Sequence, residues 1–414
     1  MTTETTGDEA TARSKPPGWS HVSARARAAA TETAQLEALI QTTGTFEAVD
    51  PDASDFTFGN PHEMPLAGLV DALKRSAEPR SVDWFAYTAS DDEPREFLAQ
   101  SLTSELGLAF EPEDVALTAG AFGAIGVAFH LLTDPGDEVV IPKPGWFLYA
   151  PMLRLAGAVP VEAPLDPVTW DLDLDAIDAA ITSRTRIVVV NSPHNPTGRV
   201  YGSRMWDELT EVLERASERI GRRVFLLSDE PYRRIRFDGI GFASPAAHYP
   251  WTLIDYSYGK VLLAPGQRLG YLATSPLMPL ADREVLRAGT FPVQASLGWA
   301  FPEAIMQHSV PALENLSIDV GELQAKRDLL HDALTGWGYD VVRPEGTFYL
   351  WGAAPGGDAV AFTDWLRERS VHVMPGTIFG QPAHVRLCLT ATREMVERAL
   401  PVFEEAAGVP WGSG

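Results

Sequence analysis

The chain is poor in cysteine. Cys388 is the only cysteine among 414 residues, which excludes an internal disulfide framework and a zinc site built from several thiolates. The absence of disulfides is typical of proteins that work in a reducing compartment. The sequence therefore predicts a cytoplasmic protein.

Long hydrophobic runs are also missing. The longest apolar stretch, residues 121–132, contains His130 and is much shorter than the roughly 20 residues that cross a membrane as a helix. Residues 1–18 are polar, include acidic side chains and lack the apolar core of a signal peptide, so they indicate a disordered arm instead of a targeting segment. We expect no membrane partner.

Positive charge is scarce as well. The sequence contains 33 Lys and Arg residues and 56 Asp and Glu residues, which gives a formal net charge of -23. Nucleic acids are bound through clustered basic side chains, so we expect no nucleic-acid partner and favour small molecules. The length and the hydrophobic content of 45% suit two domains, each with its own core.

Short β-branched runs alternate with helical patterns between about residues 110 and 275. We expect seven strands there, at "VALT", "EVVIP", "VPVEA", "RIVVVN", "VFLLSD", "TLIDYS" and "LGYLA". Helices such as residues 123–132 and 205–219 separate strands, which indicates an α/β layer with a mostly parallel sheet. No helix lies between "TLIDYS" and "LGYLA", so one strand is expected to run antiparallel and the sheet is mixed.

The pattern changes beyond about residue 310. One long helix is expected over residues 313–338, followed by the short strands "DVVRP", "TFYLW", "VHVMP" and "VRLCLT" with one helix among them. These elements indicate a smaller α+β domain. We expect a flexible arm over 1–30, a segment over 31–80 that packs with the small domain, a large domain over 81–305 and the small domain over 306–414.

Unusual residues follow the ends of the expected strands, where ligands bind in open α/β sheets. "AGAFGAIG" after "VALT" is a glycine-rich turn that opens a helix, and its free N–H groups suit a phosphate. Taken alone, such a stretch is more often a purely structural strand-to-helix turn. Trp146 in "KPGWFLY" either covers a planar ligand or packs in the core.

Two further motifs present polar side chains. "SPHNPTG", residues 192–198, holds two prolines and a glycine, which form a rigid turn that aims Asn195 outward, although an ordinary Asn-Pro turn is the alternative. In "DEPY", Asp229 follows a buried-looking run, and a buried carboxylate is costly without a cationic partner. A capped helix start is the alternative there, and Tyr232 would be a neighbour.

Lysine is the rarest of the basic residues. Lys15 lies in the polar arm, Lys74 in an exposed helical pattern, Lys143 between two prolines and Lys326 on the long helix. Only Lys260 follows a buried-looking strand and enters an apolar loop. Desolvation there would favour a free amine that attacks a carbonyl, which arginine cannot do.

These residues together fit one ligand. A planar ring would lie under an aromatic side chain, a phosphate would lie on a helix N-terminus with Ser257 and Arg268, and an aldehyde would be bonded to Lys260. Asp229 would pair with a protonated ring nitrogen. This ligand is pyridoxal phosphate, which serves as an electron sink.

The chain resembles the class I/II aminotransferases among the fold-type I pyridoxal-phosphate enzymes. Nine stretches occur in the order of that family between about residues 56 and 390: "FGNPHEMP", "TAGAFGAI", "PKPGWFLY", "NSPHNPTGRVY", "SDEPY", "YSYGKVLLAPGQRLGY", "PEGTFYLW", "VMPGTIFG" and "VRLCLT". The resemblance implies an α/β fold with a large domain around a mixed, mostly parallel seven-stranded sheet and a smaller α+β domain. It also implies pyridoxal 5'-phosphate as cofactor.

The resemblance implies a role for each matching residue. Lys260 would form the Schiff base and shuttle the proton, Asp229 would pair with the pyridinium, and Asn195 and Tyr232 would hold the ring hydroxyl. Trp146 would stack on the ring. The other implied contacts are the phosphate ligands Ala121, Phe122, Ser257 and Arg268, and the substrate ligands Gly59, Asn195 and Arg386, the last as a fork on the α-carboxylate. Tyr87 would reach a neighbouring subunit's phosphate, which implies a homodimer with shared active sites.

The implied activity is transfer of the α-amino group of an L-amino acid to a 2-oxo acid such as 2-oxoglutarate, by a ping-pong mechanism. A β- or γ-lyase, a decarboxylase or an oxidase would share the same residues, and a non-catalytic regulator on this fold is a remote alternative. Trp84, Phe85, Trp146 and Tyr149 are candidates for an aromatic substrate pocket.

Three features depart from the family pattern. Asp92 stands at or near the position of a usual glycine after Tyr87, and Gly259 precedes the lysine where serine or threonine is common. No motif identifies a second arginine for a substrate side-chain carboxylate. The candidates are Arg233, Arg234, Arg236 and Arg287.

Overall fold

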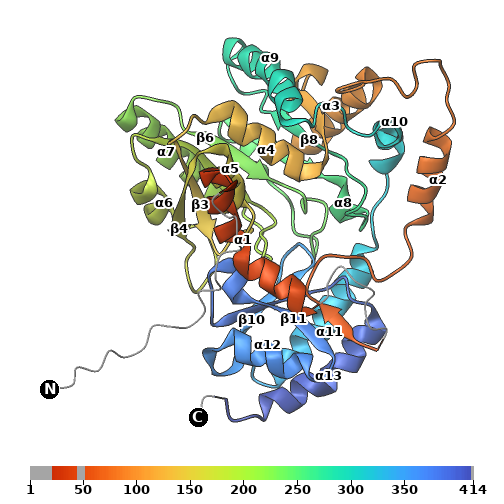
Figure 1. The fold of residues 1–414 in the computed structure, drawn as a ribbon, viewed down its shortest axis with the longest axis vertical. Coiled ribbons are helices and arrows are strands. Elements are labelled where there is room, and N and C mark those ends of the chain that lie inside the picture. Colours follow the sequence, from red (N-terminus) through yellow and green to blue (C-terminus); the bar gives the residue numbers. More distant parts are fainter. Residues whose placement is uncertain (1–20, 44–51, 412–414) are drawn as a thin grey trace.

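The computed structural model describes residues 21–43 and 52–411, which form two sheets with helices around them (Figure 1). The larger sheet and its helices occupy the upper part of the view, and the smaller sheet occupies the lower part. No helix within the described ranges is long and apolar enough to cross a membrane.

The larger sheet has seven strands in the order β2-β8-β7-β6-β5-β3-β4. Their bounds are β2 Val115–Thr118, β3 Glu138–Lys143, β4 Val159–Pro164, β5 Thr185–Asn191, β6 Phe225–Asp229, β7 Thr252–Ser257 and β8 Gly270–Thr274. Strand β8 is antiparallel to both β2 and β7, and the other pairs are parallel. All seven predicted strands and the mixed character of the sheet are confirmed.

Helices cover both faces of this sheet, which is why both faces of its central strands carry apolar side chains. In β5, Ile187 and Val189 pack in one core with helices α4 (Gly120–Leu132) and α5 (Tyr149–Ala156). Val188 and Val190 point to the opposite face, toward α6 (Leu174–Ala180) and α7 (Ser203–Ile220). The helices α3 (Asp92–Leu106), α9 (Leu280–Leu297) and α10 (Ala304–Leu313) complete this layer.

The second sheet has the order β1-β11-β12-β10-β9. Its strands are β1 Ser54–Phe56, β9 Val341–Val342, β10 Tyr349–Ala353, β11 Val371–Pro375 and β12 His384–Cys388. Helices α11 (Val320–Gly336), α12 (Ala359–Arg367) and α13 (Arg393–Ala407) share one apolar core with it. The predicted α+β character is confirmed, and β1 adds an N-terminal strand in parallel to β11.

The long helix predicted over residues 313–338 is wrong in its first part. Helix α10 ends at Leu313 and α11 begins at Val320. The side chain of Asp319 accepts the backbone N–H of Glu322 at 3.0 Å and so caps α11. Between the two helices, Arg234 donates to the carbonyls of Glu314 and Leu316 at 2.8 and 3.1 Å. Capping by Asp319 therefore overrides the apolar pattern that appeared to continue through this stretch.

The N-terminal part of the chain is divided among several elements. Helix α1 (Ala24–Thr43) begins inside the range 1–30, so the predicted arm is too long, and residues 1–20 lie outside the described residues. This helix packs against α5 and also contacts residues 376–379, whereas α2 (Ala67–Ser76) packs against α10. The remaining domain limits stay a prediction.

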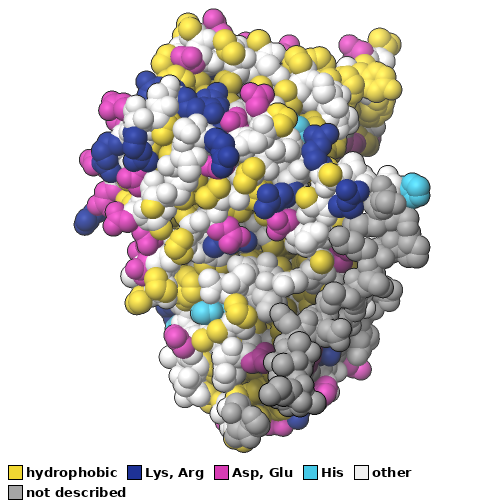
Figure 2. All heavy atoms as spheres, turned by 60° about the vertical axis from the view of Figure 1, so that its left-hand side comes forward, with side chains coloured by type: hydrophobic (Ala, Val, Ile, Leu, Met, Phe, Trp, Pro, Cys, Tyr) yellow, Lys and Arg dark blue, Asp and Glu magenta, His cyan; other side chains and the backbone are white. Residues whose placement is uncertain are grey.

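Charged side chains of both signs are interspersed on the face drawn in Figure 2. On the surface of the molecule, oppositely charged side chains form ion pairs, for example Arg219 with Asp178 at 2.7 Å and Arg204 with Glu208 at 2.8 Å. Such exposed pairs contribute little to stability.

Candidate active site

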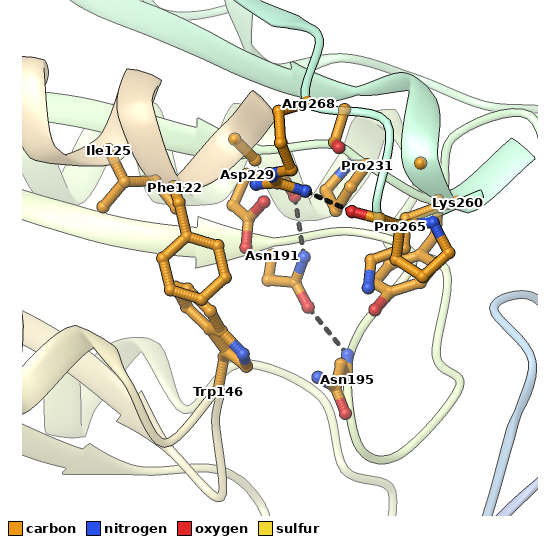
Figure 3. A pocket seen from close by; sticks show the side chains of 14 residues that line it. Phe122, Ile125, Trp146, Asn191, Asn195, Asp229, Pro231, Lys260, Pro265 and Arg268 are labelled. Carbon is orange, nitrogen blue, oxygen red and sulfur yellow. Dashed lines mark hydrogen bonds between the residues drawn. The ribbon is translucent and has the colours of Figure 1, made fainter. Parts of the chain in front are cut away.

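A cavity lies at the carboxyl ends of β5, β6 and β7 and at the start of α4 (Figure 3). Its lining residues are Ala121, Phe122, Ile125, Trp146, Asn191, Asn195, Asp229, Pro231, Tyr232, Ser257, Gly259, Lys260, Pro265 and Arg268. The structure thus brings together all the residues predicted to bind the cofactor except Tyr87. Parallel strands end at one edge of the sheet, which explains why residues far apart in sequence meet here.

Lys260 lies on α8 (Tyr258–Val261), a single turn that directly follows β7. Burial lowers the pKa of its amine to about 8, and Cys388 and Asp229 oppose this shift while Arg386 adds to it. A free amine is therefore accessible near neutral pH. The nitrogen lies 5.7 Å from the ring centre of Tyr232.

Gly259, a departure from the family pattern, has a local reason. A Cβ atom there would lie 3.0 Å from Cα of Pro265 and 3.4 Å from the carbonyl oxygen of Ala264. The 264–265 turn therefore packs directly against the residue before Lys260. A serine or threonine at 259 would have to displace this turn.

The other described lysines have different surroundings. Lys143 lies 3.2 Å from Glu162, and Lys74 is exposed on α2. Lys326 is buried and donates to the carbonyl of Ala391 at 2.8 Å. Lys15 lies outside the described residues.

Asp229 ends β6 and is buried at the cavity wall. The hydroxyl of Tyr149 donates to its Oδ2, and Oδ1 accepts no hydrogen bond from a described donor. Burial raises the pKa of this carboxyl, whereas the neighbouring carboxyl of Asp255, the hydroxyl of Tyr149 and the charge of Lys260 lower it. A ligand N–H group carrying positive charge would satisfy the open oxygen.

Two asparagines fix the floor of the cavity (Figure 3). The amide of Asn191, at the end of β5, donates to the carbonyl of Asp229 at 2.8 Å, and its oxygen accepts the N–H of Asn195 at 2.7 Å. The side chain of Asn195 then accepts a hydrogen bond from Nη1 of Arg386 at 3.0 Å. Asn191 was not predicted as a site residue, although its place at the end of "RIVVVN" was a usable signal.

Arg386 comes from β12 in the second sheet and is buried. Its Nη2 donates to the carbonyl of Thr57 at 2.8 Å, and its guanidinium lies 3.9 Å from the ring centre of Tyr349. Its Nε donates to no described group. The fork is thus held beside Asn195, next to the cavity but not among its lining residues.

The glycine at position 59 has a steric reason. A Cβ atom at this position would lie 2.6 Å from the ring of Phe348 and 3.2 Å from the hydroxyl of Tyr349. Tyr349, which was missed from the sequence, also accepts a hydrogen bond from Tyr232 at 3.3 Å. Tyr349 pairs with Cys388 across β10 and β12. The sequence does not show which residues of two strands pair, so the place of Tyr349 beside Arg386 could not be predicted.

The opposite end of the cavity is suited to an anion. Helix α4 begins at Gly120, whose φ of 74° and lack of a side chain allow Arg268 to approach, since a Cβ atom would lie 2.6 Å from its Nη2. Arg268 donates to the carbonyls of Pro265 and Ala119 at 2.7 and 3.1 Å. A helix N-terminus beside a guanidinium group binds phosphate well.

An aromatic wall closes one side of the cavity (Figure 3). The ring centre of Trp146 lies 4.7 Å from that of Phe122 and 5.1 Å from that of Tyr149, and both pairs pack edge to face. This wall offers a face to a planar ring. The residues present therefore fit pyridoxal phosphate at its phosphate, its ring and its ring nitrogen.

Other predicted candidates lie elsewhere. Trp84 stacks on His308 with ring centres 3.6 Å apart, Phe85 is exposed, and neither lines this cavity, so an aromatic substrate pocket that includes them stays a prediction. The four candidate arginines also have other partners: Arg233 with Glu105, Arg234 with the carbonyls after α10, Arg236 with the carbonyl of Ile240, and Arg287 with Asp114. None of them lines the cavity.

Comparisons with known proteins agree with this geometry. The family model described as aminotransferase class I and II matches residues 51–403. The aspartate/prephenate aminotransferase of Thermus thermophilus is 34% identical over 361 residues, which cover 86% of this chain and 91% of the relative. The aspartate aminotransferase of Geobacillus stearothermophilus is 30% identical and covers 76% of this chain and 81% of its own length.

Solved structures give the same result. The crystal structure of an aminotransferase from Eubacterium rectale superposes with a TM-score of 0.82 at 30% identity and covers 94% of this chain and 96% of that one. The Thermus thermophilus aspartate aminotransferase with maleate has a TM-score of 0.76 at 29% identity, with coverage of 93% and 99%. This chain therefore belongs to the class I and II aminotransferases and is a transaminase that uses pyridoxal 5'-phosphate.

Proposed function

We propose that the chain transfers the α-amino group of an L-amino acid to 2-oxoglutarate in two half-reactions. One observation carries this proposal: an amine with a lowered pKa, a carboxylate with an open oxygen and a buried arginine fork surround one cavity. Relatives named aspartate and aspartate/prephenate aminotransferases support the choice of a dicarboxylic partner.

The bound cofactor supplies an electron sink for the charge that develops at the substrate Cα. In our proposal, Lys260 holds the cofactor covalently through Nζ. Once the substrate has displaced it, the amine of Lys260 moves the proton between substrate and cofactor. Asp229 keeps the ring nitrogen protonated, and Tyr232 and Asn195 hold the ring hydroxyl. Trp146 covers the ring face and excludes water from it.

The phosphate end has its own set of proposed ligands. Backbone N–H groups at the start of α4, at Ala121 and Phe122, would share the phosphate with Ser257 and Arg268. All four line the cavity near the start of α4. Positive charge and oriented N–H groups favour the anion there.

Replacing Arg386 with lysine should weaken the binding of amino acid and oxo acid together. Removing one partner of a buried, bidentate pair costs about 2 kcal/mol or more, and lysine does not restore the fork. We expect both Michaelis constants to rise about 30-fold, with the cofactor still bound with its usual affinity. Steady-state kinetics and cofactor titration measure the two effects.

The matched control for this variant is Arg343→Lys, an arginine of the same part of the chain that pairs with Asp328 at the surface. It should change neither constant. Unaltered Michaelis constants in Arg386→Lys would show that the carboxylate is recognised elsewhere.

We also propose a homodimer in which Tyr87 reaches the partner's phosphate. Tyr87 is 89% exposed, and its ring centre lies 5.1 Å from that of Phe301. The ring centre of Phe301 lies 6.4 Å from that of Phe291. All three rings are exposed, as is Phe122 at the cavity. A contiguous exposed aromatic surface of this kind favours association with another subunit.

Light scattering should therefore give twice the chain mass of 45.0 kDa. Tyr87→Phe should leave the dimer intact and weaken cofactor binding about tenfold or more, because one hydrogen bond to a charged group is lost. A fully active monomer would contradict shared sites. Unchanged cofactor affinity in Tyr87→Phe would remove this residue from the phosphate site.

Lyase, decarboxylase and oxidase chemistry use the same side chains, so product analysis distinguishes them from transamination. With L-aspartate and 2-oxoglutarate we expect equal amounts of glutamate and oxaloacetate. Release of ammonia or carbon dioxide, or consumption of oxygen, would favour the alternatives. A cytoplasmic location is part of the proposal and is supported by the buried free thiol of Cys388.

A further inference from the structure

A second buried carboxyl lies beside Asp229. Asp255 on β7 is the register partner of Asp229 on β6, and paired residues of parallel strands point to the same face of the sheet. Asp229 is 5% exposed and Asp255 is fully buried. Neighbouring strands lie about 4.8 Å apart, so the side chains of these register partners are adjacent on that face. The two carboxyl groups therefore lie side by side on the same face of the sheet.

The surroundings of the two carboxyl groups differ. Asp229 accepts a hydrogen bond from the hydroxyl of Tyr149 on α5, and the positive charge of Lys260 on α8 lowers its pKa. Neither oxygen of Asp255 accepts a hydrogen bond from a described donor, and no described cation forms an ion pair with it. The charges of Asp229 and Glu230 both raise the pKa of Asp255.

These surroundings decide where a proton resides. Two adjacent buried carboxylates cannot both be ionised at low cost, so the pair keeps one proton. The donor and the cation favour the anion at Asp229, whereas two acidic neighbours disfavour it at Asp255. In agreement, burial and then the charge of Asp229 raise the pKa of Asp255 well above its usual range.

We propose that Asp255 is a positioning residue whose protonated carboxyl donates a hydrogen bond to the carboxylate of Asp229. This bond and the bond from Tyr149 hold the carboxylate of Asp229 from two sides. They leave a single negative charge in a fixed orientation toward the cavity. The inference rests on the proposed pairing of Asp229 with the cofactor ring.

Infrared spectroscopy of the apoenzyme tests the protonation without any turnover. Burial raises the pKa of Glu230 to about 7, so at about pH 9 this group is ionised and the carboxylic acid band of Asp255 should remain. We expect Asp255→Asn to abolish this band. Glu230→Gln should keep it.

The wild-type spectrum decides the protonation even if a variant does not fold. The absence of a carboxylic acid band at that pH would overturn the proposal. So would a band that persists in Asp255→Asn, because the proton would then reside on another group.

Cofactor titration of the apoenzyme tests the positioning role. Asp255→Asn retains a donor of the same size and should bind pyridoxal phosphate within about threefold of wild type, whereas Asp255→Val has no donor and should bind about tenfold more weakly. Circular dichroism checks that both variants are folded. Equal affinities of the three proteins would overturn the role of Asp255, whereas wild-type affinity in Asp229→Asn would instead refute the proposed pairing of Asp229.

Discussion

Lys260→Ala should abolish transamination while leaving the fold intact. The variant loses both the covalent attachment of the cofactor and the group that moves the proton, so we expect turnover to fall by about four orders of magnitude. The side chain enters a cavity and makes no ion pair with a described residue, so little folding energy depends on it. Initial rates of the reconstituted variant measure the loss.

Borohydride reduction supplies the chemical control. Wild-type enzyme should retain the cofactor covalently after reduction, and Lys260→Ala should release it on denaturation. The matched variant Lys143→Ala removes a lysine that pairs with Glu162 and should behave as wild type. A covalent, borohydride-dependent link in Lys260→Ala would show that another lysine holds the cofactor.

Asp229→Asn should lower kcat about 100-fold or more. An amide carries no charge to keep the ring nitrogen protonated, and a neutral ring is a poorer electron sink. Asparagine has nearly the same size and can still accept the hydroxyl of Tyr149, which donates to Asp229 in the native protein. The loss should therefore appear in kcat with little change in thermal stability.

Asp137→Asn is the control for this charge change, because Asp137 pairs with Arg222 at 3.0 Å far from the cavity lining. It should leave kcat within about twofold of wild type. Full activity in Asp229→Asn would remove the charge role and favour a purely structural cap at the end of β6.

Much of the site followed from the sequence because parallel strands end at one edge. Lys260, Asp229 and Asn195 each follow an apolar run, so the runs predicted both the strands and the convergence of these side chains. The scarcity of lysine singled out Lys260. Local patterns were sufficient for these residues.

Other features depend on register and on contacts between distant segments. Asp255 was invisible as a partner of Asp229 because the sequence does not state which residues pair across β6 and β7. The contact of Arg386 with Asn195 joins residues 191 positions apart. The break before α11 was missed because the cap at Asp319 competes with an apolar pattern that extends across it.

Transamination is tested most directly by a single half-reaction. Holoenzyme is mixed with one L-amino acid and no acceptor, and the absorbance of the cofactor is followed for each amino acid in turn. For at least one donor, we expect full conversion to pyridoxamine phosphate with one equivalent of 2-oxo acid per site, and recovery of the original spectrum when 2-oxoglutarate is added. Failure of every amino acid to convert the cofactor, or release of ammonia or carbon dioxide in place of the 2-oxo acid, would contradict this function.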